Sequence, residues 1–419
     1  MQCYICSNTN LTNFLNLGNH PPPLNFVTKE RLLDKNEAFP LQVFFCSNCG
    51  LVQLGDAVDP RIMFKEYLYT SGVSTAFRAH LESFTEMLVE RFSPNKDDLV
   101  IDIASNDGTL LQFFKNSGSR VLGVEPSNIA DIAMKNGIQT VNDFFNEGVA
   151  KQILDENGQA KIITITNAFA HIKDLDSLMN GIRILLKEDG VFVSESQYLV
   201  DIIEKLEYDT IYHEHLRYYS LKPLIQLFEK YDMDVFDCER ISSHGGSIRV
   251  YASLKGKFTK SDNVKNIIDY EDQLKLSEIE TYQEFAKKIH ENKNKLISLL
   301  LKIKEDGHKI VGISAPARSS TILNFCNINS ENLDYIAEKS TLKIGKFTPG
   351  SHREVVDDNQ LVIDQPGAEF DNSHVDILSN GFKIRTSSQD ANNPAGQQYL
   401  YAAFGQPMVA GSNIAATGR

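Results

Sequence analysis

The chain has 419 residues, of which 42% are hydrophobic and 23% charged, so we expect a folded globular protein with two or three domains. Its net charge of −13 argues against non-specific binding to nucleic acid or to an anionic membrane surface. No apolar run is long enough to span a membrane, and the N-terminus lacks the pattern of a secretory signal, so we expect a cytoplasmic protein.

Four of the six cysteines form two close pairs near the N-terminus, Cys3 with Cys6 and Cys46 with Cys49. Two such pairs can present four thiolates tetrahedrally to one zinc ion, and a cytosolic setting favours a metal over disulfides. A redox role is the competing interpretation, although one pair would be enough for it. We predict a closed structural zinc site whose spacer of about forty residues folds back as a loop or small sheet.

The segment Phe64–His80 crowds hydroxyl groups around Gly72, among them those of Tyr67 and Tyr69. It predicts either a ligand-facing loop or a polar turn with a capping Ser or Thr. A helix is expected to follow, from about Ser74 to Phe92.

A strand, a small turn and a helix are predicted next. The apolar run that opens Leu99–Thr109 stops at a turn with one glycine, the helix Leu110–Asn116 follows, and the strand Arg120–Val124 ends at Glu125. This pattern opens a doubly wound α/β sheet, where ligands lie at the carboxyl ends of the strands. An acidic residue in this position can bind both hydroxyls of a ribose. The single glycine suits an adenosine cofactor without a pyrophosphate better than a dinucleotide.

Three more predicted strands each end in a polar cluster. The strands are Thr140–Val141, Lys161–Thr166 and Gly190–Ser196, and the clusters are Asp143–Phe145, Asn167–His171 and Glu195–Tyr198. Because the carboxyl ends of parallel strands share one edge of a sheet, these clusters belong to the expected site.

The segment Ile211–Tyr219 holds two histidines, one glutamate and three tyrosines in nine residues. Such a run should pack poorly, because burial would leave many polar groups without partners. It suits proton transfer, because His titrates near neutral pH, Glu can orient it and Tyr can donate to an oxyanion. The alternative is a solvated helix start or a satisfied polar cluster.

The remaining predicted elements complete one α/β domain and begin a second. They are a helix at Leu221–Tyr231, paired strands at Val235–Ile241 and Ser247–Ser253, long helices within Asn263–Asp306, strands at Lys309–Ile313 and Leu333–Ala337, and a helix at Thr321–Phe325. Gly245 and Gly246, between the paired strands, predict a tight turn or a close approach to a ligand.

Several motifs together, in this order, resemble the deoxysugar C-methyltransferases. They are the two Cys-x-x-Cys pairs, Asp102–Gly108, Val124–Ser127, Asn167–Ile172, Tyr212–Tyr219, His244–Val250 and Ala315–Arg318. These enzymes use S-adenosylmethionine to methylate carbon 3 of a nucleotide-linked 4-keto-6-deoxysugar. The resemblance runs from about Met1 to about Val356.

The resemblance implies an α/β architecture with a zinc-binding lobe, a central Rossmann-like class I methyltransferase domain, a helical linker and a smaller, truncated Rossmann-like C-terminal lobe. The expected boundaries are 1–62, 63–258, 259–308 and 309–358, followed by a tail at 359–419. The partner it implies is a nucleotide-sugar substrate that the outer lobes help to enclose, with no nucleic acid and no membrane.

The resemblance also implies roles for individual residues. The zinc ligands would be Cys3, Cys6, Cys46 and Cys49; the cofactor-binding residues Asp102, Ala104, Asn106, Gly108, Glu125, Asn142, Asp143, Phe144 and Asn167; and the catalytic residues His215, Tyr212, Glu214, His171 and Tyr69. His215 would be the base, and Glu125 would bind the cofactor ribose.

This chemistry agrees with the polar run. A carbon beside a ketone becomes a nucleophile only after losing a proton, which requires a base of near-neutral pKa and donors for the enolate oxygen. The enolate then attacks the sulfonium methyl group in line. A methyltransferase for another acceptor, or a viral structural protein with an inactive domain, remains an alternative.

Two departures from the family pattern stand out. The turn Gly312–Ser320 has lost glycines, which puts its role in nucleotide binding in question. After about Asp357 the closing strands of the family are missing, and Val375–Arg419 resembles the end of phage tail or virion proteins. That resemblance implies virion or tail components as partners, and short strands and loops as structure.

Overall fold

The computed structural model describes residues 1–34, 37–55, 57–64, 70–338 and 340–357, together with five short strands between Val375 and Ala416. The chain forms two compact units. The first comprises Met1–Asn16, Gln42–Glu207 and His213–Ala286, and the second comprises Leu17–Leu41, Tyr208–Tyr212 and Lys287–Arg419.

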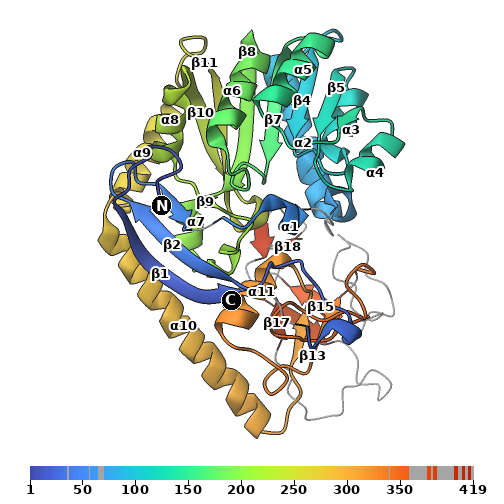
Figure 1. Cartoon of the computed structure of the whole chain (residues 1–419), viewed down its shortest axis with the longest axis vertical. Coiled ribbons are helices and arrows are strands. Elements are labelled where there is room, and N and C mark those ends of the chain that lie inside the picture. The colour runs from blue at the N-terminus through green and yellow to red at the C-terminus, as the bar shows by residue number, and fades with distance from the viewer. Residues whose placement is uncertain are drawn as a thin grey trace. The chain divides into compact units, whose positions relative to one another are not determined.

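A seven-stranded sheet forms the centre of the first unit (Figure 1). Its strands are, in order across the sheet, β10 (Met233–Ile241), β11 (Ser247–Leu254), β8 (Leu186–Gln197), β7 (Ala160–Thr166), β4 (Leu99–Ile103), β5 (Arg120–Val124) and β6 (Thr140–Val141). Neighbours from β8 to β6 pair in parallel, whereas β11 pairs with both β8 and β10 in antiparallel. The predicted doubly wound sheet is confirmed, with its site edge at the carboxyl ends of the parallel strands.

Helices cover both faces of this sheet. They include α2 (Thr75–Phe92), α3 (Thr109–Asn116), α5 (Glu147–Asn157), α6 (Leu175–Leu185) and α8 (Leu221–Lys230). Leu99, Ile101 and Ile103 of β4 pack in one hydrophobic cluster with α5, α6 and α8, whereas Val100 packs in another with α2 and α3. Successive strand residues point to opposite faces, so a strand covered on both faces is apolar throughout.

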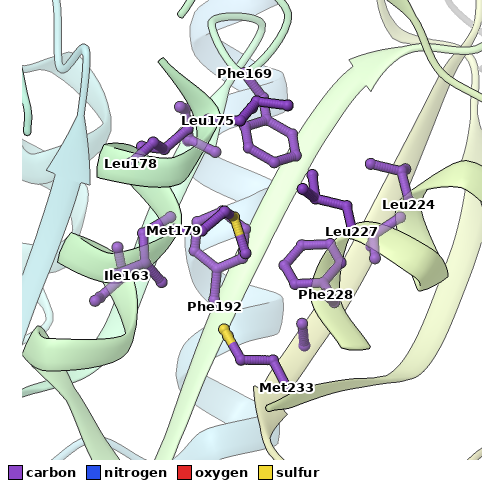
Figure 2. Close-up of a cluster of buried hydrophobic side chains, with 14 of the residues drawn as sticks. Ile163, Phe169, Leu175, Leu178, Met179, Phe192, Leu224, Leu227, Phe228 and Met233 are labelled. Atoms are coloured by element: carbon purple, nitrogen blue, oxygen red, sulfur yellow. The ribbon is translucent and has the colours of Figure 1, made fainter. Parts of the chain in front are cut away.

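Figure 2 shows part of the first cluster. Met179 of α6 and Phe228 of α8 lie around Phe192 of β8, and the rings of Phe192 and Phe228 are 5.7 Å apart between centroids. Burial of such side chains contributes roughly 1.5–3 kcal/mol each, so this packing fixes the sheet edge that carries the site.

The other helical elements of the first unit are α1 (Pro60–Phe64), η2 (Ser71–Val73), α4 (Ala130–Lys135), α7 (Leu199–Glu204), η4 (Ser243–Gly245) and α9 (Asp262–Gln273). The helix predicted after Ser74 is confirmed as α2. The Ser74 hydroxyl oxygen accepts a hydrogen bond from the Phe77 amide at 3.2 Å, which caps the helix.

A second sheet has the order β1-β2-β3-β9. Its strands are β1 (Leu11–His20), β2 (Phe39–Cys46), β3 (Val52–Leu54) and β9 (Arg217–Tyr218). The sequence predicted that the cysteine spacer folds back, but it did not predict β9, which comes from the polar run. Val52 of β3 pairs with Tyr218 of β9 in antiparallel.

The second unit contains a small parallel sheet in the order β14-β13-β12-β17. The strands of this sheet are β12 (Val311–Ile313), β13 (Tyr335–Glu338), β14 (Val355–Asp357) and β17 (Tyr401–Ala403). The same unit contains the helical elements η1 (Lys29–Arg31), η3 (Tyr208–Thr210) and α11 (Ala317–Phe325). It also contains two separate strand pairs, β15 (Val375–Leu378) with β16 (Gly381–Ile384) and β18 (Met408–Ala410) with β19 (Ile414–Ala416). Helix α10 (Ile279–Glu305) runs from the first unit into the second. Most of the predicted 359–419 tail lies outside the described residues.

Within the described part of the chain, none of the helices combines the length and the hydropathy that a membrane span requires.

Candidate functional site

Four cysteine thiols converge in the first unit. The sulfur atoms of Cys3, Cys6, Cys46 and Cys49 all lie within 4.8 Å of one another. The Cys3–Cys49 and Cys6–Cys46 Sγ–Sγ distances are 3.4 and 3.5 Å. A tetrahedral ion with Zn–S bonds of about 2.3 Å holds its thiolates roughly 3.8 Å apart, so these residues fit the predicted zinc ion.

Tight backbone turns bring these thiols together. The Ser7 amide donates to the Cys3 carbonyl at 3.0 Å, and the Gly50 amide donates to the Cys46 carbonyl at 2.8 Å. A hydrogen bond from Cys49 lowers the pKa of the Cys3 thiol to about 5. A thiolate, the form that binds metal, is therefore available at neutral pH.

A cavity of about 350 Å³ opens at the carboxyl edge of the central sheet. Its walls come from the turn after β4, the loop after β5, the loop after β7, the region of α1 to α2, and η4. This volume is within the range of small-molecule sites, and the position at a doubly wound sheet edge is the one expected for a ligand.

The turn after β4 holds the carboxylate of Glu125. Ala104 and Asn106 have φ values of 58° and 52°, a left-handed conformation that turns the backbone sharply. The Asn106 amide donates to Glu125 Oε2 at 2.9 Å, and the Ser127 amide donates to Oε1 at 2.9 Å. Each oxygen keeps accepting capacity for a ligand hydroxyl, so Glu125 is fixed as an acceptor on the cavity wall.

Asp102 lies beside this turn and also lines the cavity. The Thr164 hydroxyl donates to Asp102 Oδ1 at 2.7 Å. Burial, and to a lesser degree the charge of Glu125, raise the pKa of Asp102 to about 7. Its ionisation is therefore sensitive to any charge that enters the cavity.

Three predicted cofactor residues do not line the described cavity but support its wall. Gly108, at a φ of 77°, precedes α3. The side-chain Nδ2 of Asn142 donates to the Glu125 carbonyl at 2.7 Å, and Asp143 Oδ1 accepts from the Phe144 backbone amide at 2.7 Å. In this loop only Phe144, of the predicted residues, reaches the cavity, with its side chain partly exposed.

Three polar atoms on the cavity wall are buried without a hydrogen-bond partner among the described residues. They are Ser105 Oγ, Asn167 Nδ2 and His171 Nε2. A buried polar atom without a partner costs roughly 1–3 kcal/mol. Three of them in one cavity therefore indicate that a polar ligand belongs there.

The rings of His171 and His215 are in contact, with centroids 5.1 Å apart. His171 lines the cavity, where the Phe64 ring stacks on it at 5.8 Å. His215 is buried beside His171 and is not among the described lining residues. Burial, together with the charges of His215 and Arg217, holds the pKa of His171 well below its usual value, so this imidazole is neutral at pH 7.

Most of the polar run Ile211–Tyr219 is buried, so the expectation that it would pack poorly is wrong. Arg217, only 1% exposed, supplies several of the missing partners. It donates to the Tyr219 hydroxyl at 2.9 Å, to the Phe169 carbonyl at 3.1 Å and to the Ile172 carbonyl. Burial of this run costs less free energy than expected, because Arg217 donates hydrogen bonds to backbone carbonyls of the loop after β7.

The other predicted catalytic residues are placed as follows. Glu214 is buried in the first unit. Tyr212 is half-buried and belongs to a segment of the second unit. Tyr69 lies outside the described residues.

Two aromatic side chains of the cavity wall were given no role in the site from the sequence, His244 of η4 and Phe77 of α2. Their rings meet edge to face, with centroids 4.8 Å apart at 89°. The available signal was a histidine directly before two glycines at the end of a strand, a pattern that the sequence could explain equally well as a turn.

Four protein families match parts of the chain. Residues 3–64 match a candidate zinc-binding domain, 77–237 a methyltransferase domain, and 242–369 the C-terminal domain of C-methyltransferases. Residues 350–407 match a domain of unknown function. This last match gives no support to the predicted resemblance to phage tail or virion proteins, and it falls mostly outside the described residues.

Among characterised proteins, the chain is similar to the C-methyltransferase NovU of Streptomyces niveus. The two are 31% identical over 352 residues, which is 84% of this chain and 84% of NovU.

Among solved structures, an S-adenosylmethionine-dependent methyltransferase from Anabaena variabilis is 20% identical and covers 42% of this chain and 86% of its own, with a TM-score of 0.35. The PH0226 protein from Pyrococcus horikoshii is 15% identical and covers 47% of this chain and 97% of its own, also with a TM-score of 0.35.

Proposed function

Because this chain belongs to the family of S-adenosylmethionine-dependent C-methyltransferases, we propose that it methylates carbon 3 of a nucleotide-linked 4-keto-6-deoxysugar. Bound S-adenosylmethionine supplies the methyl group. The observation that supports this acceptor best is the pair of imidazole rings formed by His171, which lines the cavity, and His215, which is buried in contact with it. A carbon acceptor needs a base before it can react.

We assign the cofactor to the part of the cavity formed after β4 and β5. Glu125 would accept the two ribose hydroxyls, which its fixed carboxylate supports. Phe144 would face the adenine, while Asp102 and Asn167 would line the rest of the cofactor site. Ala104, Asn106 and the supporting residues Gly108, Asn142 and Asp143 would hold these groups in place.

We assign proton removal from the sugar to His215, with Tyr212, Glu214 and Tyr69 completing the site as the family resemblance implies. A neutral His171 suits the partner role, because it can donate a hydrogen bond to the oxygen that becomes the enolate. Its unpartnered Nε2 is the atom that supports this assignment. The enolate carbon would then attack the methyl group, with both substrates held in one cavity.

Solvent exchange tests the base directly. Wild-type protein should exchange the hydrogen on carbon 3 of a 4-keto sugar nucleotide in D₂O and should transfer methyl to that carbon. In His215→Ala we expect both rates to fall by at least about 100-fold, which is the usual contribution of a general base. NMR measures the exchange rate, and mass spectrometry measures methyl transfer.

Affinity for S-adenosylhomocysteine, measured by calorimetry, should stay unchanged in His215→Ala. The control is His308→Ala, a half-buried histidine that does not line the described cavity, and it should keep both activities. Full activity of His215→Ala would remove the base assignment. Methyl transfer to a hydroxyl or an amine, without exchange at carbon, would replace the carbon acceptor.

A further inference from the structure

We propose that His244 is a second acceptor-binding residue, which donates a hydrogen bond to an oxygen of the sugar from a different wall of the cavity than His171. The inference rests on the proposed function, since it takes the acceptor to be a sugar. It adds a residue that the residue assignments above leave without a role.

The strand order places His244 away from the cofactor. His244 lies between β10 and β11, whereas Glu125 follows β5, and β11 and β5 are separated by β8, β7 and β4. Neighbouring strands are about 4.8 Å apart, so the four steps from β5 to β11 span roughly 19 Å. An adenosine bound by the loops that follow β4 and β5 therefore leaves space for the acceptor beside the carboxyl ends of β7 and β8 and the start of β11.

The wall that His244 forms has the composition that a sugar needs. The edge-to-face partner of His244 is Phe77, and the stacking partner of His171 is Phe64; all four rings line the cavity. A sugar ring presents oxygens at its edge and C–H groups on its faces. Two pairs, each with one polar and one apolar ring, offer hydrogen bonds and apolar contact side by side.

The backbone of His244 is held in an unfavourable conformation. Its φ of 56° and ψ of 29° are left-handed, which costs free energy for a residue with a Cβ. A Cβ at Gly246 would lie 2.1 Å from Cγ of Asp201, so only glycine fits there. Arg240 holds that carboxylate with contacts of 2.7 and 2.9 Å, and Lys205 donates to the Gly245 carbonyl. Strain maintained by its surroundings is typical of ligand contacts.

A neighbouring hydroxyl can set the tautomer of the imidazole. Ser243 Oγ lies 2.8 Å from His244 Nδ1. When the hydroxyl donates to Nδ1, the ring hydrogen resides on Nε2, so the neutral imidazole keeps one N–H donor. This donor can bind a sugar hydroxyl or carbonyl oxygen without any change of charge.

Replacement of His244 by glycine gives a test that does not threaten the fold, because glycine relieves the left-handed strain. For His244→Gly we expect the KM for the 4-keto sugar nucleotide to rise at least tenfold, while the affinity for S-adenosylhomocysteine changes less than twofold. His244→Gln, whose amide nitrogen can reach the position of Nε2, should recover part of the loss. Ser93→Gly is the matched control, since Ser93 is also left-handed (φ 44°) but exposed and away from the cavity lining.

An unchanged acceptor KM in His244→Gly, or a loss of cofactor affinity as large as the loss of acceptor affinity, overturns the inference alone, provided that the wild type is active. Inactivity of the wild type towards every 4-keto sugar nucleotide in a panel contradicts the proposed function, and the inference falls with it.

Discussion

Asp102 is a side chain of the cavity whose charge changes near neutral pH. Its pKa of about 7 results mainly from burial and secondarily from the negative charge of Glu125. Both causes disfavour the ionised carboxylate. A ligand that brings positive charge into the cavity has the opposite effect, because it stabilises the ionised form.

We therefore predict that binding of S-adenosylmethionine, a sulfonium cation, releases protons near neutral pH. With a pKa of about 7, about half of the Asp102 carboxyls are protonated at pH 7, so release of up to about half a proton per chain is expected. The release should vanish above about pH 9, where Asp102 is already ionised. Calorimetry in phosphate and in Tris, which differ in ionisation enthalpy, measures it.

Asp102→Asn, which keeps an acceptor for Thr164, should bind the cofactor without releasing the proton. Identical heats in the two buffers for the wild type would show that Asp102 does not sense the cofactor charge.

Strand β9 connects its sheet to the loop after β7, because Arg217, the first residue of β9, donates hydrogen bonds to that loop. The Arg217 guanidinium donates to the carbonyls of Phe169 and Ile172, which flank His171 in the sequence. Its carbon also lies 5.0 Å from the centre of the Tyr4 ring, between the first two cysteines. One buried cation therefore joins the cysteine turn to the loop that carries a cavity histidine.

Arg217→Met should lower the free energy of unfolding by roughly 3 kcal/mol or more. The substitution leaves two buried carbonyls and a tyrosine hydroxyl without their charged donor, and each such loss costs roughly 1–3 kcal/mol. Urea titration monitored by circular dichroism measures the change. Arg183→Met, which removes an exposed arginine whose nearest carboxylate contact is 3.4 Å, should change stability by less than about 0.5 kcal/mol. Equal effects of the two variants would refute this role of Arg217.

At the scale of the whole molecule, the cysteine cluster stabilises a sheet that includes part of the polar run. Cys46 ends β2, and β2, β3 and β9 are consecutive neighbours in that sheet. A structural zinc ion contributes folding free energy directly, so its loss should lower the stability of this sheet, including strand β9.

We predict one zinc ion per chain by elemental analysis, and a lower melting temperature after treatment with 1,10-phenanthroline. Methyl transfer should fall more steeply than cofactor affinity, because the cofactor site that we propose after β4 and β5 includes no residue of the sheet β1-β2-β3-β9. Cys49→Ser should reproduce the effect, whereas Cys238→Ala, at a buried thiol outside the cluster, should retain the zinc. Chelation without any shift of the melting temperature would contradict a structural metal.

Much of this arrangement could be predicted from local sequence. The spacing of Cys3, Cys6, Cys46 and Cys49 is sufficient to predict a four-thiol cluster, because few other structures need two such pairs. The run from Leu99 to Glu125 predicts a strand, a helix and a second strand, because strands buried on both faces are apolar throughout. The acidic residue at its end then lies at the site edge.

The remainder depends on partners that are distant in the sequence. Nothing near Arg217 shows that Val52 and Gln53 will pair with its strand, so the burial of the polar run could not be foreseen. The place of His244 in the cavity could not be foreseen for a related reason. Its place in the cavity follows from the fit of Gly246 against Asp201, a contact between residues that belong to separate elements.

The pairing of β3 with β9 also bears on how this protein could have evolved. An N-terminal piece ending near Phe64 would carry all four cysteines but lack the strand that covers one edge of β3. An exposed strand edge promotes aggregation, so we expect this N-terminal piece not to function as an independent domain when fused to an unrelated protein. Recombination that exchanged the metal lobe would have to bring a matching Arg217–Tyr218 with it, which couples the inheritance of two distant parts of the gene.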